Sequence, residues 1–208
     1  MPFTATGLML IIVGFWGFLM ACMILPGEGW SWTANTGTTI YGTPMNLSAL
    51  SFNILMGICG GVIGAWLLNR DPFWMMSGAL AGIISVASGL DVYFPALAFI
   101  VAIGAGLLLR PAARMLEAFG IDDAVGAVTV HGTIGVYGMV VFGVFAAGYP
   151  ALFIENAPTV SILGQLVGAI VCSLCGFIPG YLLSLGLSGL GMLRTPEAAE
   201  LAGLDPTK

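Results

Sequence analysis

The single histidine, His131, is the residue of this sequence best suited to proton chemistry. It lies in an apolar run of more than twenty residues, 124–148, whose only other ionisable group is Tyr137. Imidazole can exchange a proton near neutral pH, and an ionisable side chain within an apolar span usually faces a cavity or a partner. The alternative is a neutral imidazole that hydrogen-bonds to Thr129, Thr133 or a nearby carbonyl group. Both interpretations stay open from position alone.

The cysteines do not form a convincing reactive site. All four lie in apolar runs, where a thiol usually behaves as a small hydrophobic group: Cys22, Cys59, Cys172 and Cys175. The last two have the spacing of a redox or metal motif, but no further cysteine, histidine or basic residue lies near them in the sequence. There is also no nucleophile–base pair, metal-ligand cluster or phosphate-binding glycine motif. We therefore predict no enzyme, no metal site and no cofactor; a pigment at His131 would lack any supporting motif.

The composition predicts that these residues are positioned by membrane helices. The 208 residues are 59% hydrophobic and 7% charged, and the mean hydropathy is +1.04. A soluble domain has about 25% charged residues. The net charge of −5 comes from acids scattered between apolar runs, which excludes a nucleic-acid partner. The expected fold is an all-α, polytopic bundle in a lipid bilayer.

About six transmembrane segments are predicted where charges, polar runs and Gly/Pro clusters interrupt the apolar sequence. A helix needs about twenty apolar residues to cross a bilayer. The segments are 4–26, 44–68, 73–90, 93–109, 124–148 and 160–193. His131 would then lie roughly 10 Å from the cytoplasmic side, near mid-depth, at 1.5 Å per residue. We expect one transmembrane domain over residues 1–193 and a short cytoplasmic tail over 194–208.

The basic residues predict the orientation of the chain. All five fall on one side of a six-span arrangement: Arg70, Arg110, Arg114, Arg194 and Lys208. The opposite loops carry only Glu28, Asp91 and Glu155 as charges. Basic loops stay in the cytoplasm, so both termini are expected there. We expect an integral protein of a bacterial inner membrane, either plasma or intracytoplasmic.

Several stretches together resemble the ammonium transporter (Amt/Mep/Rh) family. The segment "GIDDAVGAVTVHGTIGVYGMVVFGVFA" around His131 resembles the penultimate helix of that family. Other stretches agree in order: "FWGFLMA", "TPMNLSALSFNILMGICGGVIGAWLL", "SGALAGIISVASG", "QLVGAIVCSLCGF" and the tail "LRTPEAAELAGLD". The resemblance covers nearly the whole chain, but only the C-terminal half of the family, whose members usually have eleven spans built from two inverted repeats and a last long helix.

The resemblance implies roles for individual residues. His131 matches the second of two pore histidines, the first of which belongs to the other repeat, and Phe18 matches a gate phenylalanine. Asn46, Asp122 and Asp123 match further family positions, and we interpret these three as structural, with the acids capping a helix. The chain departs from the family where Leu19 replaces an asparagine and Gly126 replaces an acid.

Two functional hypotheses follow. In the first, the chain is one half of an ammonium or ammonia pore that a partner membrane chain completes; His131 and the tail favour it. In the second, the half-transporter fold is a non-transporting structural subunit of a larger membrane complex; Leu19 and Gly126 favour it. An inert truncated product is a third alternative. The one-sided charge argues against an antiparallel homodimer, and a parallel homo-oligomer would not rebuild the pore. Either way, we expect the chain to occur in a hetero- or homo-oligomer.

Overall fold

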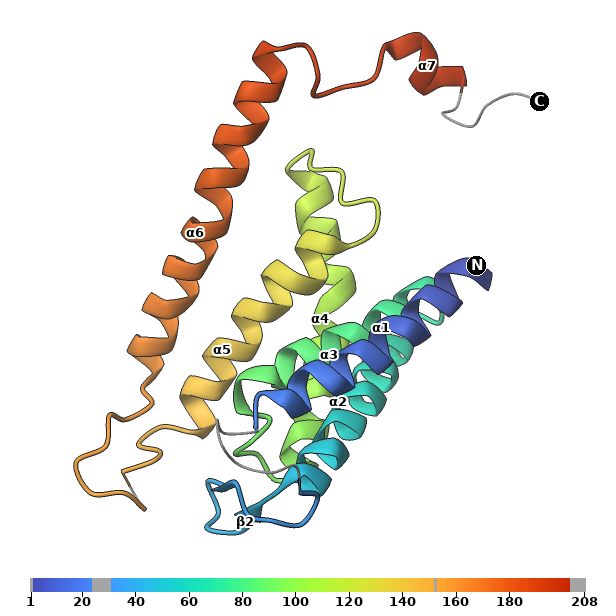
Figure 1. Cartoon of the computed structure of the whole chain (residues 1–208). Helices are drawn as coiled ribbons and strands as arrows, with labels where there is room; N and C mark the ends of the chain where they lie inside the picture. The colour runs from blue at the N-terminus through green and yellow to red at the C-terminus, as the bar shows by residue number, and fades with distance from the viewer. Residues whose placement is uncertain (1, 24–30, 152, 203–208) are drawn as a thin grey trace. The chain divides into compact units, whose positions relative to one another are not determined.

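Long apolar helices form most of the chain in the computed structural model, which describes residues 2–23, 31–151 and 153–202 (Figure 1). The helices are α1 (Pro2–Ala21), α2 (Leu47–Leu68), α3 (Pro72–Val86), η1 (Ala87–Gly89), α4 (Pro95–Ala118), η2 (Val128–Thr133), α5 (Ile134–Phe145), α6 (Ile162–Gly189) and α7 (Glu197–Ala202). Two short strands, β1 (Gly37–Thr38) and β2 (Pro44–Met45), pair antiparallel. Within the described residues, six helical segments are long and apolar enough to cross a membrane. The predicted all-α membrane bundle is therefore confirmed.

The chain forms two compact units, residues 1–167 and 168–208. Helix α6 begins in the first unit and continues into the second, where α7 follows. In the second unit the described side chains are nearly all exposed, apart from Ala169 and a few partly buried ones, and Phe177 and Tyr181 stack with ring centroids 5.6 Å apart. The boundary predicted at residue 193 stays a prediction.

Helix α2 forms the centre of the first unit because glycines on two of its faces let neighbouring helices approach closely. A Cβ atom on Gly61 would overlap the carbonyl oxygen of Gly78 in α3. On another face, a Cβ atom on Gly64 would overlap the carbonyl oxygen of Ile103 in α4. Glycine removes this steric barrier, so the three helices pack with backbone against backbone. These helices fix the frame on which α1, η2 and α5 lie.

Hydrogen bonds across helices hold this frame together. The buried amide of Asn53 in α2 donates to the carbonyl oxygens of Leu90 (2.9 Å) and Tyr93 (2.8 Å) in the connection before α4. The hydroxyl group of Tyr137 in α5 donates to the carbonyl oxygen of Val101 in α4 at 3.0 Å. Since unpaired polar groups are costly in an apolar interior, these bonds restrict the helices to one arrangement.

The two ends of the first unit differ in charge. Helices α2 and α4 run in the same direction and end at the arginine end, where the Arg70 guanidinium lies 5.1 Å from the Trp66 ring and that of Arg110 lies 4.9 Å from Trp74. The opposite, hairpin end consists of residues 31–46, 90–94, 146–151 and 153–161. There the backbone N–H of Ile40 donates to the carbonyl oxygen of Val92 at 3.0 Å.

The helix bounds differ from the predicted segments mainly in α4. The prediction ended this segment at residue 109 because an arginine follows, whereas α4 continues to Ala118. Arg110 is accommodated because its guanidinium lies on the Trp74 ring and 3.4 Å from the Glu117 carboxylate. The predicted end of the first segment, residues 24–26, lies outside the described residues, as do Glu28 and Lys208.

Candidate functional site

His131 lies in η2, a six-residue π-helical turn that leads directly into α5. The wider turn is visible in the backbone, because the N–H of Ile134 donates to the carbonyl oxygen of Thr129, five residues earlier. Thr129 and Val130 are buried, whereas His131 is exposed. Its imidazole makes no hydrogen bond, ion pair or ring contact with another described residue. Short π-helical turns are frequent at functional sites. Because η2 starts at Val128 and continues directly into α5, His131 lies in the first turn of this continuous helix and not halfway along it.

The carboxylate of Asp123 fixes the start of η2. It accepts hydrogen bonds from the backbone N–H of Val128 (3.0 Å) and from both the N–H and the hydroxyl group of Thr129 (2.8 Å each). Partial burial acts to raise the pKa of Asp123, but hydrogen bonds from residues 127–129 outweigh it and hold this pKa below its ordinary value. An ionised Asp123 therefore stabilises the turn that carries His131.

The neighbouring positions have different roles. Asp122 is exposed and makes no hydrogen bond or ion pair with any other described residue, so of the two acids only Asp123 caps the helix. Gly126, where the family usually has an acid, has a φ of +73° and donates its N–H to the carbonyl oxygen of Asp123 at 2.8 Å. A residue with a side chain is strained at such a φ, so this turn requires glycine.

Phe18 and Leu19 are neighbours on α1 but differ in burial. The Phe18 side chain is 64% exposed, whereas Leu19 is 8% exposed and belongs to the main apolar core. The leucine that replaces the family asparagine therefore contributes to helix packing. Phe18 contacts Phe15 edge to face, with ring centroids 6.5 Å apart. Asn46 begins α2, where its side-chain oxygen accepts a hydrogen bond from the N–H of Ala49 at 2.9 Å.

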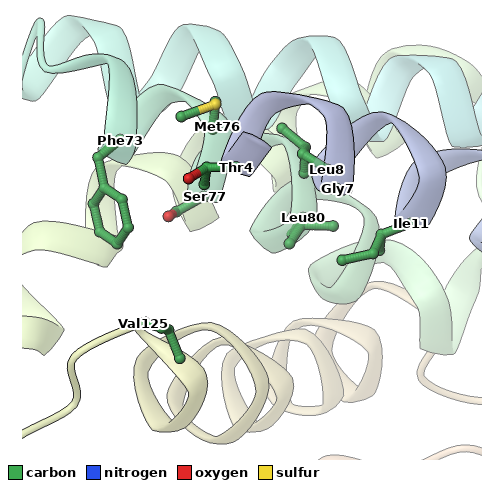
Figure 2. A pocket seen from close by; sticks show the side chains of 9 residues that line it. All are labelled: Thr4, Gly7, Leu8, Ile11, Phe73, Met76, Ser77, Leu80 and Val125. Carbon is green, nitrogen blue, oxygen red and sulfur yellow. The ribbon is translucent and has the colours of Figure 1, made fainter. Parts of the chain in front are cut away.

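Three hollows follow one another along α1. The first, of about 210 Å³, lies between α1, α3 and Val125 at the arginine end (Figure 2). Figure 2 shows Val125 across this groove from Leu8, Ile11 and Leu80. The second, of about 360 Å³, shares Ile11 with the first and reaches Phe18. The third, of about 330 Å³, shares Phe18 with the second and reaches Asp91 at the hairpin end.

Together the hollows form a mostly apolar track along the length of α1, which we call the α1 groove. Polar side chains line it only toward its two ends, with Thr4 and Ser77 at one end and Cys22 and Asp91 at the other. His131 is not among the residues that line these three hollows.

Comparison with known proteins decides the family. The sequence profile of the Ammonium Transporter Family matches residues 1–208. The chain belongs to the ammonium transporter family. It is 36% identical over 164 residues to ammonium transporter Amt1 of Methanocaldococcus jannaschii, a match that covers 77% of this chain and 41% of that protein. It is 28% identical over 215 residues to a putative ammonium transporter of Synechocystis sp., covering 99% of this chain and 36% of that protein.

The fold agrees with this membership. A solved structure described as a sensor Amt protein superposes with a TM-score of 0.76 and 23% identity, over 99% of this chain and 48% of that one. The chain thus spans less than half the length of the relatives it matches. The two sequence relatives are named as ammonium transporters.

Sequence reasoning found some of this site and missed other parts. His131 and Phe18 are exposed and lie toward opposite ends of the unit, on η2 and α1. Ile11 and Val125 were missed because nothing distinguishes them from other apolar residues in sequence. Asp91 carried a usable signal, because it is the only charged residue between Asp71 and Arg110. That isolation marked it as a loop residue but did not reveal its proximity to Phe18.

Proposed function

We propose that this chain forms one half of an ammonium or ammonia pore and that further helices, from a partner chain or another segment, cover the α1 groove. The observation that carries this proposal is the row of mostly apolar hollows along α1, two of which Phe18 lines, together with the exposed His131 on η2 of the same unit. A lone imidazole facing lipid lacks hydrogen-bond partners, and an unsatisfied polar group in hydrocarbon costs several kcal/mol. A second half with its own histidine would remove this penalty.

In the proposed pore, ammonium gives its proton to water at one mouth, ammonia crosses the apolar section, and ammonia takes a proton from water at the other mouth. Phe18 restricts access from the hairpin end, where it separates two hollows of the groove. His131 exchanges hydrogen bonds, and protons where needed, with the passing molecule and with the second imidazole. An imidazole suits this task because one ring nitrogen donates while the other accepts.

The arrangement in the membrane is part of the proposal. The arginine end faces the cytoplasm, both termini are cytoplasmic, and the membrane is a bacterial inner membrane. The charge asymmetry supports this, since Arg70, Arg110 and Arg114 all lie at that end of the first unit. A uniform orientation also means that two copies of this chain do not pair antiparallel.

The alternative is a structural subunit without transport. The packing of Leu19 in the core favours it, because the asparagine of the family would otherwise add a polar group beside Phe18. In this case a partner covers the α1 groove permanently, and no pathway remains between its two ends.

The test begins with purification of the tagged chain from its native membrane in a gentle detergent and mass spectrometry of the proteins that accompany it. The isolated assembly is then reconstituted into liposomes, and uptake of labelled methylammonium is measured for Phe18→Ala and for Val13→Ala. Val13 is 71% exposed on the same helix but lines none of the three hollows, so it is a matched control. We expect only Phe18→Ala to change the rate. Equal rates in both variants, or an assembly without uptake, would favour the structural subunit.

A further inference from the structure

The turn that carries His131 holds one residue more than an α-helix needs. The backbone N–H of Ile134 donates to the carbonyl oxygen of Thr129, five residues earlier. One turn before, the N–H of Val130 donates to the carbonyl oxygen of Gly126, four residues earlier, at 2.8 Å. An α-helix uses the four-residue pairing throughout, and isolated π-helical turns are rare. A specific contact must therefore stabilise the wider turn in η2.

The helix that follows η2 is fixed to its neighbours. The hydroxyl group of Tyr137 donates to the carbonyl oxygen of Val101 at 3.0 Å. The carbonyl oxygen of Gly138 accepts a hydrogen bond from the hydroxyl group of Ser88 at 3.2 Å. Ile134, the first residue of α5, is fully buried. Since α5 is held in place, a change of pairing in η2 would have to move the residues before Ile134.

The four-residue pairing would exchange buried and exposed positions, and we call the choice between the two pairings the register of η2. If the N–H of Ile134 bonded to the carbonyl oxygen of Val130, Val130 would take the place of Thr129. His131 would then take the place of Val130, which is 3% exposed and belongs to an apolar cluster with Leu109. The register therefore decides whether the imidazole of His131 is exposed or buried among apolar side chains.

The hydroxyl group of Thr129 is the contact that distinguishes the two registers. The Asp123 carboxylate accepts the N–H groups of Val128 and Thr129, but backbone donors are alike at every position. After a shift of one residue it could accept those of Thr129 and Val130 instead. The Thr129 hydroxyl also donates to this carboxylate, at 2.8 Å, and Val130 has no such group to replace it. A hydrogen bond to a charged group favours one state by about tenfold to a hundredfold.

We propose that Thr129 is a positioning residue whose hydrogen bond to Asp123 selects the π-helical register of η2 and so keeps His131 exposed. The polar imidazole favours the same register, because its burial without a partner is costly. The importance of this exposure for conduction rests on the proposed function, in which His131 meets a second imidazole. The selection of the register does not rest on it.

The reactivity of a cysteine at position 131 reports the register and needs no transport. The full chain is purified in a gentle detergent, with His131→Cys as its only thiol after the four native cysteines are replaced by alanine: Cys22, Cys59, Cys172 and Cys175. The rate of modification by N-ethylmaleimide is then measured. A thiol is accepted in an apolar interior, so His131→Cys removes the preference of the imidazole and leaves the Thr129 hydroxyl to decide.

Three substitutions define the expected result. Thr129→Val has a similar shape but no hydroxyl group, so the commoner four-residue pairing should prevail and the rate at position 131 should fall at least about fivefold. Thr129→Ser keeps the hydroxyl group and should keep the rate within about twofold. The matched control places the only thiol at Val136→Cys, an exposed position in the fixed helix α5, where Thr129→Val should change the rate by less than about twofold.

A thiol at Val130→Cys separates a change of register from simple opening of the turn. Val130 is buried in the present register and would move to the buried place of Thr129 in the other. Its rate should therefore stay low in Thr129→Val. Faster modification at both positions 130 and 131 would mean that the turn opens, and it would overturn the inference. An unchanged rate at position 131 would overturn it as well.

The outcomes also separate this inference from the proposed function. A fivefold fall in an assembly without uptake supports the register role of Thr129 and refutes the pore. An unchanged rate in an assembly whose uptake requires His131 supports the pore and refutes the register role. If Thr129→Val fails to accumulate, Thr129→Ala takes its place with the same expected fall, and a fall of equal size in Thr129→Ser would contradict the inference.

Discussion

The capping of η2 by Asp123 yields a prediction that can be worked out from the structure. Asp123→Ala removes an acceptor of three hydrogen bonds, from the N–H of Val128 and from the N–H and hydroxyl group of Thr129. Loss of a helix N-cap typically costs about 1 to 2 kcal/mol. We take the upper value of about 2 kcal/mol because the carboxylate is charged and satisfies two backbone donors. Local opening of residues 128–134 should then be about 30-fold more frequent.

Hydrogen–deuterium exchange followed by mass spectrometry of that segment measures this opening. Asp122→Ala is the matched control, because Asp122 is the adjacent acid but makes no hydrogen bond to another described residue. Exchange in residues 128–134 should be about 30-fold faster in Asp123→Ala and nearly unchanged in Asp122→Ala. Equal exchange rates in the two variants would refute the capping of η2 by Asp123.

The capping of η2 by the Asp123 carboxylate also predicts that the stability of this turn depends on pH. The folded-state pKa of Asp123 is lowered relative to its ordinary value, so the stabilisation is fully present above the unfolded-state pKa. It is lost as the pH falls through the lower, folded-state pKa. Relative to the intrinsic exchange rate at each pH, the amides of residues 128–134 in the unmodified chain should therefore lose protection only under acidic conditions, and Asp123→Ala should lack this transition. A transition of equal size in both proteins would assign it to another group.

Two further predictions concern the frame of the first unit. Gly61→Ala should destabilise the chain by more than about 2 kcal/mol because its Cβ atom would overlap backbone atoms of α3. The Cβ atom of the control Gly135→Ala meets nothing within 4 Å, so this variant should be neutral or slightly stabilising. Thermal unfolding in detergent compares the two variants, and equal midpoints would contradict the glycine packing. Asn53→Ala should lower the free energy of unfolding by about 2 to 3 kcal/mol because it leaves two buried carbonyl groups without a donor. A change below about 0.5 kcal/mol in the same assay would mean that water or another group replaces the amide.

Sequence patterns predicted the fold well because a membrane restricts the alternatives. Apolar runs of about twenty residues leave few options other than spanning helices. The pairs Gly57/Gly61 and Gly60/Gly64 have the four-residue spacing that is typical of close helix packing, and they lie against α3 and α4 respectively. The predicted limit of α4 at residue 109 was wrong because hydropathy counts Arg110 as an interruption. The contacts that accommodate it, with Trp74 and Glu117, depend on the tertiary structure.

The site was only partly predictable. His131 stood out because an isolated titratable group in an apolar run is unusual, and Phe18 followed from the resemblance. The π-helical turn was not predictable, because residues 128–133 have no composition that distinguishes a π-helix from an α-helix. The meeting of Phe18 and Asp91 in one hollow also could not be foreseen, since 72 positions separate them in sequence and only the packing of α1 against α2 and α3 brings them together.

The most direct test of the central claim is methylammonium uptake by the reconstituted assembly with His131→Ala against Val136→Ala. Val136 is also exposed and lies five residues further along the same helical segment, so its loss reports only general damage to this segment. If the chain supplies half of a pore, His131→Ala should change the uptake rate by at least about tenfold, in line with the loss of a proton-handling group, while Val136→Ala stays within about twofold. Uptake that is absent in the unmodified assembly, or identical in all three proteins, would contradict the account.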